Sequence, residues 1–219
     1  MMNFFTELQI EYFENYLSLI KTTVENDSNK LKEKEQKIKD GGEKPFTSED
    51  GQHWDPYDDL IDEVFHMENM EQLMYRTYMI GILVFIEDQI NNVCISIERA
   101  DKLMFSYKDL KGTGVGRAIK YLETVTKKDF LTDTETRKHF EIARIVRNSL
   151  VHQDGKIDKN NRKKIETYIT EYPDILFLTE ATYIIKIKCN YLKTLIDLSK
   201  KIYLELKVQN RPLWSNQIN

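Results

Sequence analysis

The stretch Met79-Ile-Gly-Ile-Leu-Val-Phe-Ile86 is the longest apolar run in this chain of 219 residues. It lies inside a mostly helical pattern that extends from Tyr57 to about Phe105. A helix that is apolar on all sides belongs at the centre of a bundle or in an interface between subunits. Gly81 indicates either a close approach of a neighbouring helix or a kink. We therefore predict an all-α protein, an antiparallel helical bundle built around this segment.

The regions before this segment predict one long N-terminal helix. An amphipathic stripe from Phe4 to Val24 continues into Lys30–Lys39, where Lys and Glu alternate with almost no apolar residue, so we expect a solvated arm. Because the later pattern from Tyr57 exceeds ordinary helix lengths, we also expect a break between Met67 and Gly81. The predicted organisation is an N-terminal helix with its arm over 1–40, a mobile loop over 41–56, the bundle over 57–210 and a C-terminal tail over 211–219.

The second half of the chain predicts shorter elements. The glycine-rich loop Lys111–Arg117 lacks the preceding strand and the Gly-Lys-Ser/Thr ending of a nucleotide loop, so it is expected to lead into a helix ending near Lys128. A capping-box arrangement, Thr132-Asp-Thr-Glu135, predicts the next helix, which ends near His152. Then follow a basic connector over Lys156–Lys164, a short helix up to Tyr172, and a closing helix over Tyr191–Val208. Over 175–187 the β-branched residues indicate a small β-hairpin, with a helix as the alternative.

Charge is distributed unevenly along the chain. The net charge is −4, which does not indicate a protein covered in nucleic acid. The segment Lys102–Lys164 holds 16 basic and 8 acidic residues, a balance of +8, so the remainder carries −12. A basic middle in an acidic protein is typical of a site for an anionic substrate, although fluctuation in a lysine-rich composition gives the same balance.

Cysteine use and the N-terminus predict a cytoplasmic protein without a membrane segment. Cys94 and Cys189 both fall in apolar helical patterns and are expected to be buried free thiols in a reducing compartment. No basic region of a signal peptide precedes Glu7. The apolar run that ends at Ile86 is too short to span a bilayer.

The helix that ends near His152 concentrates polar side chains on one ridge. At about 100° per residue, Asn148 lies near 40° and His152 near 80° from Arg144, with Arg147 near −60°. The apolar residues of the helix occupy the opposite arc, with Val151 as the exception. A solvated polar face is the ordinary reading of such a ridge, so the spacing alone does not establish a site.

The sequence Arg147-Asn-Ser-Leu-Val-His152 resembles the Arg-x(4–6)-His motif of the HEPN superfamily, including the asparagine directly after the arginine. The resemblance covers mainly residues 134–160, with a looser agreement of helical layout from 57 to 208. The Lys/Glu arm and the hairpin depart from a minimal HEPN bundle, and the subfamily is not identified. The resemblance implies metal-independent RNA cleavage without a cofactor, in toxins or phage-defence proteins, with a homodimer that joins two motifs. It also implies that a cognate antitoxin or regulatory protein is a candidate partner.

The chemistry of these residue types agrees with RNA cleavage. Attack by a ribose 2′-hydroxyl needs a base with a pKa near the working pH, and an ordinary histidine, here His152, suits that role. Arg147 offers a planar set of donors to the phosphorane oxygens and does not deprotonate. Asn148 is expected to orient the imidazole or contact the ribose. The expected contacts to the RNA backbone are Arg144, Lys156, Lys159, Arg162 and Lys163.

One geometric difficulty accompanies this prediction. Arg147 and His152 diverge by about 140° on a straight helix. Either the helix unwinds near His152, or a second protomer completes a composite active site, and the second option predicts a twofold dimer.

Two other readings stay open on the sequence alone. One is a catalytically silent HEPN-like module that binds RNA or dimerises, and the other is an unrelated helical bundle with a chance motif. No metal site is predicted, because the remaining histidines, His53, His66 and His139, have no ligand partners at metal spacing.

Overall fold

The computed structural model describes residues 2–112 and 114–209. Helices dominate, and the strands form two separate antiparallel hairpins. The predicted all-α class with a small hairpin within 175–187 is confirmed, and the predicted tail at 211–219 lies outside the described residues. The elements in chain order are α1 (Met2–Lys39), β1 (Phe46–Thr47), β2 (His53–Trp54), α2 (Pro56–Ala100), a 3-10 turn (Tyr107–Asp109), α3 (Gly114–Thr126), α4 (Thr134–Gln153), α5 (Lys159–Glu171), β3 (Leu176–Leu178), β4 (Ile185–Ile187) and α6 (Cys189–Gln209).

The helix α2 runs without interruption from Pro56 to Ala100, so the break predicted between Met67 and Gly81 is wrong. Asp55 caps its start, and a proline in the first turn is compatible with a helix. The unusual length is supported by four neighbours, because α1, α3, α4 and α6 all contact α2. A Cβ atom at Gly81 would lie 3.8 Å from the Phe13 ring. This is an ordinary van der Waals distance, so α1 packs beside Gly81 without requiring a glycine there.

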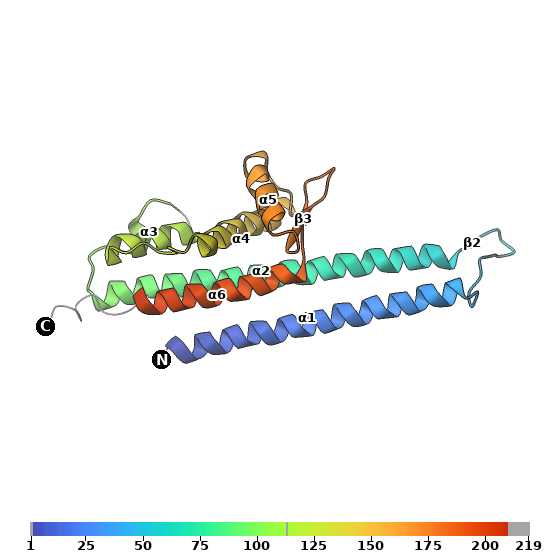
Figure 1. Cartoon of the computed structure of the whole chain (residues 1–219), viewed down its shortest axis with the longest axis horizontal. Coiled ribbons are helices and arrows are strands. Elements are labelled where there is room, and N and C mark those ends of the chain that lie inside the picture. The colour runs from blue at the N-terminus through green and yellow to red at the C-terminus, as the bar shows by residue number, and fades with distance from the viewer. Residues whose placement is uncertain (1, 113, 210–219) are drawn as a thin grey trace.

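The helices α1 and α2 lie side by side along the longest dimension of the molecule (Figure 1). Half-buried positions recur every three or four residues along the Lys/Glu-rich part of α1, and Ile38 near its end is buried. Lys34 Nζ lies 2.7 Å from Glu63 Oε1 across the pair. The arm predicted to be solvated therefore packs against α2, since the aliphatic stems of Lys and Glu cover the few apolar contacts.

The other helices cover the apolar centre of α2. Figure 1 shows α6 running along the C-terminal half of α2, with α3 and α4 above this half in the view and α5 further out. Met79, Ile82 and Ile90 of α2 are completely buried, as are Leu192 and Leu195 of α6. The prediction that this segment forms the centre of the bundle is confirmed. By burial of its apolar surface, α2 organises the core.

The loop between α1 and α2 contains a minimal hairpin that the sequence did not indicate. Phe46 pairs with Trp54, and their ring centroids are 5.5 Å apart. The Trp54 indole N–H donates to Asp59 Oδ2 at 2.8 Å. These contacts close the far end of the α1–α2 pair.

The hairpin β3–β4 supports the turn that follows α4. Lys156 forms an isolated bridge with Ile184, and the Ile185 N–H donates to the Gly155 carbonyl at 2.9 Å. Gln72 of α2 holds the hairpin from the other side, because its amide both donates to and accepts from the backbone of Ile187, each at 2.9 Å. The end of α4 is thereby tied to α2 through the hairpin.

The helix α5 begins earlier than predicted. The basic segment Lys156–Lys164 is helical from Lys159 onward, so its description as a connector is wrong for that part. Asp158 caps the helix by accepting from the N–H groups of Asn160 and Asn161, at 2.9 and 3.1 Å. An aspartate before a run without proline or glycine was the overlooked start signal.

Both cysteines are free thiols, but only Cys94 is fully buried, while Cys189 is half-buried. Burial raises the pKa of the Cys94 thiol to about 12. One described helix, α2, is long and apolar enough to cross a membrane by length and composition alone. A central helix of a bundle passes the same test, so the structure is compatible with a soluble protein, and a cytoplasmic location stays a prediction.

Candidate active site

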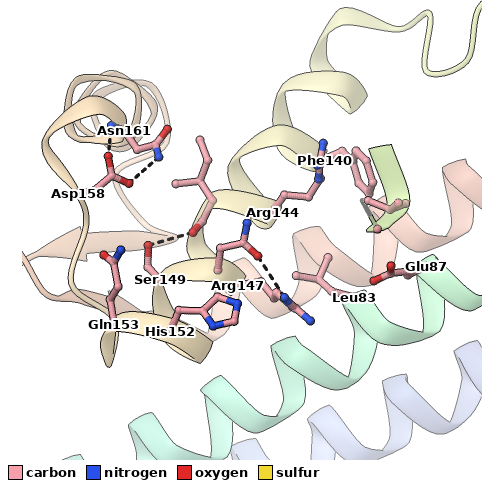
Figure 2. A pocket seen from close by; sticks show the side chains of 14 residues that line it. Leu83, Glu87, Phe140, Arg144, Arg147, Ser149, His152, Gln153, Asp158 and Asn161 are labelled. Atoms are coloured by element: carbon pink, nitrogen blue, oxygen red, sulfur yellow. Dashed lines mark hydrogen bonds between the residues drawn. The ribbon is translucent and has the colours of Figure 1, made fainter. Parts of the chain in front are cut away.

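The polar ridge of α4 opens onto a pocket of about 500 Å³ (Figure 2). Four helices contribute to it: α2, the start of α3, α4 and the start of α5. The residues that line it are Leu83, Glu87, Gly114, Val115, Phe140, Arg144, Ile145, Arg147, Asn148, Ser149, His152, Gln153, Asp158 and Asn161. All three predicted catalytic residues, together with Arg144, are brought together there.

The apolar arc predicted for α4 packs into the core. Ile142, Ala143 and Val146 are buried, and Ser149 is buried with its hydroxyl donating to the Ile145 carbonyl at 3.0 Å. Val151, the predicted exception, is exposed. This packing fixes the rotation of α4 and leaves the polar ridge facing the pocket.

The two arginines of the ridge are held differently. Arg147 is half-buried, extends towards Leu83 of α2, and donates from Nη1 to Asn148 Oδ1 at 3.2 Å (Figure 2). Arg144 is exposed, and its guanidinium lies 5.9 Å from the Phe140 ring centroid. A Cβ atom at Gly116 would lie 3.4 Å from Arg144 Nη2, so the start of α3 passes close to this side chain. Two fixed positive charges therefore stand on one side of the pocket.

His152 lies in the last turn of α4 and is exposed. The helix continues to Gln153, so the alternative in which it unwinds near His152 is wrong. Arg147 and His152 nevertheless line the same pocket, because α2, α3 and α5 close around the ridge. Among the described residues, no hydrogen bond or ion pair engages the His152 imidazole. Its ring is therefore available to a ligand.

The turn after His152 has a backbone that needs glycine. Asp154 and Gly155 both have positive φ, 49° and 83°, and the Gly155 N–H donates to the Ser149 carbonyl at 2.9 Å. A Cβ atom at Gly155 would meet Arg76 Nη2 at 3.3 Å and Ile184 at 3.5 Å. The Arg76 guanidinium also pairs with Asp154, Nη1 to Oδ1, at 3.1 Å. The end of α4 is thus fixed by α2 and by the β3–β4 hairpin.

Of the residues predicted to bind substrate, only Arg144 lines the pocket. The others, Lys156, Lys159, Arg162 and Lys163, lie outside the lining. Arg162 is half-buried and its guanidinium carbon lies 3.3 Å from the Tyr183 ring centroid, so it packs α5 against the β3–β4 hairpin. Lys156, Lys159 and Lys163 are exposed. These three side chains can contact a ligand only where it extends beyond the pocket.

Sequence reasoning missed part of the lining. Glu87 of α2 lines the pocket, although it was not among the predicted site residues. Asp158 and Asn161 enter through the cap of α5. Gly114, from the glycine-rich loop, lies at the pocket because α3 starts there, and a Cβ atom on it would lie 3.5 Å from Glu87 Oε1. In the sequence, Glu87 is marked only by its position on the helix directly after the apolar segment Met79–Ile86.

The second histidine of α4 has a different environment. His139 Nδ1 lies 2.6 Å from the Tyr168 hydroxyl, and His139 Nε2 lies 3.6 Å from Glu135 Oε1. Its ring packs at a tilt of 57° against the Tyr172 ring, with centroids 5.0 Å apart. Burial lowers the pKa of the His139 imidazole, against the opposing effect of Glu135. His139 is therefore a packed neutral side chain between α4 and α5.

Within residues 2–112 and 114–209, no group of three or more His, Cys, Asp and Glu is placed to hold a metal ion. No protein-family model, curated protein or solved structure matches the chain.

Proposed function

We propose that this protein is a metal-independent endoribonuclease of HEPN type, acting as a toxin or phage-defence effector. The observation that carries the proposal is that Arg147, Asn148 and His152 line one pocket together with Arg144. The HEPN-like motif is thus borne by a helix whose apolar face is packed and whose motif residues face a space that can hold a ligand.

The proposed reaction is attack of a ribose 2′-hydroxyl on the neighbouring phosphate. Arg147 stabilises the charge that develops on the phosphorane oxygens, and its hydrogen bond to Asn148 limits the orientations of its guanidinium. His152 transfers a proton, since its imidazole has no protein partner among the described residues. Arg144 and the exposed lysines 156, 159 and 163 attract the phosphate backbone.

The active form is proposed to be a homodimer. The pocket is open, and Arg144, Asn148 and His152 on its rim are exposed. A second copy that places its own rim opposite this one holds the RNA between two pockets and excludes water, which strengthens the interactions with phosphate. Light scattering at working concentration tests this step, and a monomeric mass would count against it.

A generic single-stranded RNA in the presence of a chelator tests the activity. The wild-type protein is expected to cleave it and to leave cyclic phosphate ends. Arg147→Ala and His152→Ala are each expected to reduce kcat/KM by about 10²–10⁴-fold. His66→Ala, which changes an exposed histidine outside the pocket, is the matched control. Equal cleavage by all four proteins contradicts the proposal.

The toxin or defence role needs a cellular test. Expression of the wild-type protein is expected to arrest growth, and expression of His152→Ala at the same level is not. If both proteins arrest growth, the toxicity does not depend on His152 and the pocket. A cognate antitoxin or regulatory protein, proposed as a partner, is expected to relieve the arrest when produced together with the wild type.

The second candidate is a catalytically silent module that binds RNA or dimerises. The acidic net charge of −4 favours it, because a dedicated RNA enzyme gains affinity from a basic surface. In that case wild type and His152→Ala bind RNA equally and neither turns it over.

A further inference from the structure

Cleavage of RNA by its own 2′-hydroxyl needs two proton transfers. A base removes the hydroxyl proton as the 2′ oxygen attacks, and an acid protonates the departing 5′ oxygen. The attacking and leaving oxygens stand on opposite sides of the phosphorus, so base and acid must also lie on opposite sides of the bound phosphate. The motif supplies only one proton-transfer group, His152. A second group is required in the same pocket.

Glu87 of α2 occupies the opposite side of the pocket. In the view of Figure 2, the Arg147 guanidinium and Leu83 stand between the His152 imidazole and the Glu87 carboxylate, and all four side chains line the pocket. A phosphate bound by Arg147 would therefore have one titratable group on each side. The carboxyl group of Asp158, which also lines the pocket, is already engaged by the N–H groups of the α5 cap and by the Asn161 amide.

The surroundings of Glu87 suit a base. The side chain is half-buried on α2, and no hydrogen bond or ion pair of the described residues engages its carboxylate. Gly114 at the start of α3 lies against it: a Cβ atom there would be 3.5 Å from Oε1. The charged groups facing it across the pocket are Arg144 and Arg147 of α4. A carboxylate without a permanent partner is free to accept a proton from a ligand.

We propose that Glu87 is the general base and His152 the general acid of the ribonuclease reaction. This inference rests on the proposed function. The 2′-hydroxyl proton moves to the Glu87 carboxylate while the 2′ oxygen bonds to phosphorus. The bond from phosphorus to the 5′ oxygen breaks, and that oxygen takes a proton from the His152 imidazolium. The products are a 2′,3′-cyclic phosphate and a 5′-hydroxyl, and exchange of protons with water restores both groups.

The assignment also redefines what a second copy contributes. Both proton-transfer groups and both arginines belong to one chain, so the second copy encloses the RNA without completing the chemistry. Mixed dimers of Arg147→Ala and His152→Ala chains are therefore expected to stay inactive. Recovery of cleavage on mixing would show that the groups come from two chains and would overturn the inference, while leaving the ribonuclease activity established.

The decisive experiment compares an ordinary RNA with one whose scissile 5′ oxygen is replaced by sulfur. A thiol has a far lower pKa than an alcohol, so the sulfur leaves without a proton and needs no acid. His152→Ala is expected to approach the wild-type rate on the sulfur substrate. Glu87→Gln, which still lacks its base, is expected to stay slower by about 10²-fold or more on both substrates. Rescue of Glu87→Gln by sulfur would overturn the assignment.

Asp88→Asn is the matched control, because Asp88 is the adjacent acid on α2 and lines the groove on the α1 side of that helix. It is expected to behave as wild type. The dependence of kcat/KM on pH gives a second readout: Glu87→Gln loses the low-pH limb of the profile, and Glu87→Asp retains it at a reduced rate. If Arg147→Ala abolishes cleavage but Glu87→Gln matches Asp88→Asn, this inference alone fails. If the wild type cleaves neither substrate, the proposed function fails.

Discussion

Two histidines of α4, His139 and His152, share a helix and differ in everything that decides their use. His139 is enclosed by Glu135, Tyr168 and Tyr172, and burial lowers its pKa. His152, thirteen residues later and therefore about 220° further around the helix, lies exposed at a pocket rim. Their different positions around the helix place His139 against α5 and leave His152 open to solvent. The sequence places both on helices, but only the neighbouring elements determine their environments.

The largest expected effect is that replacing His152 lowers activity but hardly changes stability, whereas replacing His139 lowers stability but hardly changes activity. Under the proposed function, His152→Ala should lower RNA cleavage by about 10²–10⁴-fold, and it should change the free energy of unfolding by less than about 0.5 kcal/mol. His139→Ala should retain most of the cleavage but cost about 1–3 kcal/mol, because the buried Tyr168 hydroxyl loses its partner. Cleavage assays and denaturant unfolding of both variants measure the two quantities. If folded His139→Ala is less active than His152→Ala, the roles assigned to the two histidines are wrong.

A smaller effect is expected at the turn that positions His152. Gly155→Ala should cost about 1–2 kcal/mol for positive φ alone, and more because the new Cβ crowds Arg76 and Ile184. Gly51→Ala is the control, since Gly51 has nearly the same φ, 85°, with nothing within 4 Å of the added atom. Thermal unfolding should rank Gly155→Ala as the more destabilised variant. Equal shifts would mean that contacts at the turn do not hold the His152 end of α4.

The lowered pKa of His139 is also expected to make the stability of the protein depend on pH. The pKa of His139 is lower in the folded protein than the ordinary value of 6.5. Between these two pKa values the unfolded chain binds more protons, so the free energy of unfolding falls as pH drops below 6.5, by at most about 1.4 kcal/mol per pH unit. Urea unfolding between pH 5 and 8 measures this slope. His139→Gln should flatten it, and an unchanged slope in that variant would assign the effect to other groups.

The smallest effect concerns the ion pair beside His152. Asp154 is 93% exposed, so its pairing with Arg76 is screened by solvent and contributes about 0.2–1 kcal/mol. Asp154→Asn should therefore shift the unfolding midpoint only slightly and leave cleavage unchanged. A large loss of cleavage in this variant would show that charge, and not the backbone turn, orients the end of α4.

Much of the fold was predictable because it follows from local periodicity. The apolar run at Met79–Ile86 gave the central helix, and the β-branched segment at 175–187 gave the hairpin. The continuity of α2 was not predictable, since helix length there depends on four neighbouring helices that the local pattern does not contain. The packed Lys/Glu arm was missed for a similar reason: its apolar seam at Ile38 is too sparse to register by periodicity.

The candidate site was predictable only where it lies on one helix. The ridge of Arg144, Asn148 and His152 is a property of α4 alone, and the structure places these residues at one pocket. Glu87 and Asn161 come from other helices, and their approach depends on tertiary packing. Arg162 was predicted to bind substrate because it is cationic, but the ring of Tyr183 occupies its guanidinium. Charge in a sequence indicates what a side chain can bind, and packing decides which partner it meets first.

The position of α6 affects how the protein folds during its synthesis. Lys200 of α6 pairs with Glu14 of α1 at 2.6 Å. Two helices from opposite ends of the described chain therefore contact each other, and each also contacts α2. The ribosome makes α2 well before α6, and at about 5–20 residues per second the interval between Ala100 and the end of α6 is roughly 5–20 s. During that time the face of α2 that α6 covers in the folded protein stays exposed, and we expect chaperones to bind there. Because α4 also packs on α6, the helix that carries most of the pocket gains this support only after α6 has been synthesised.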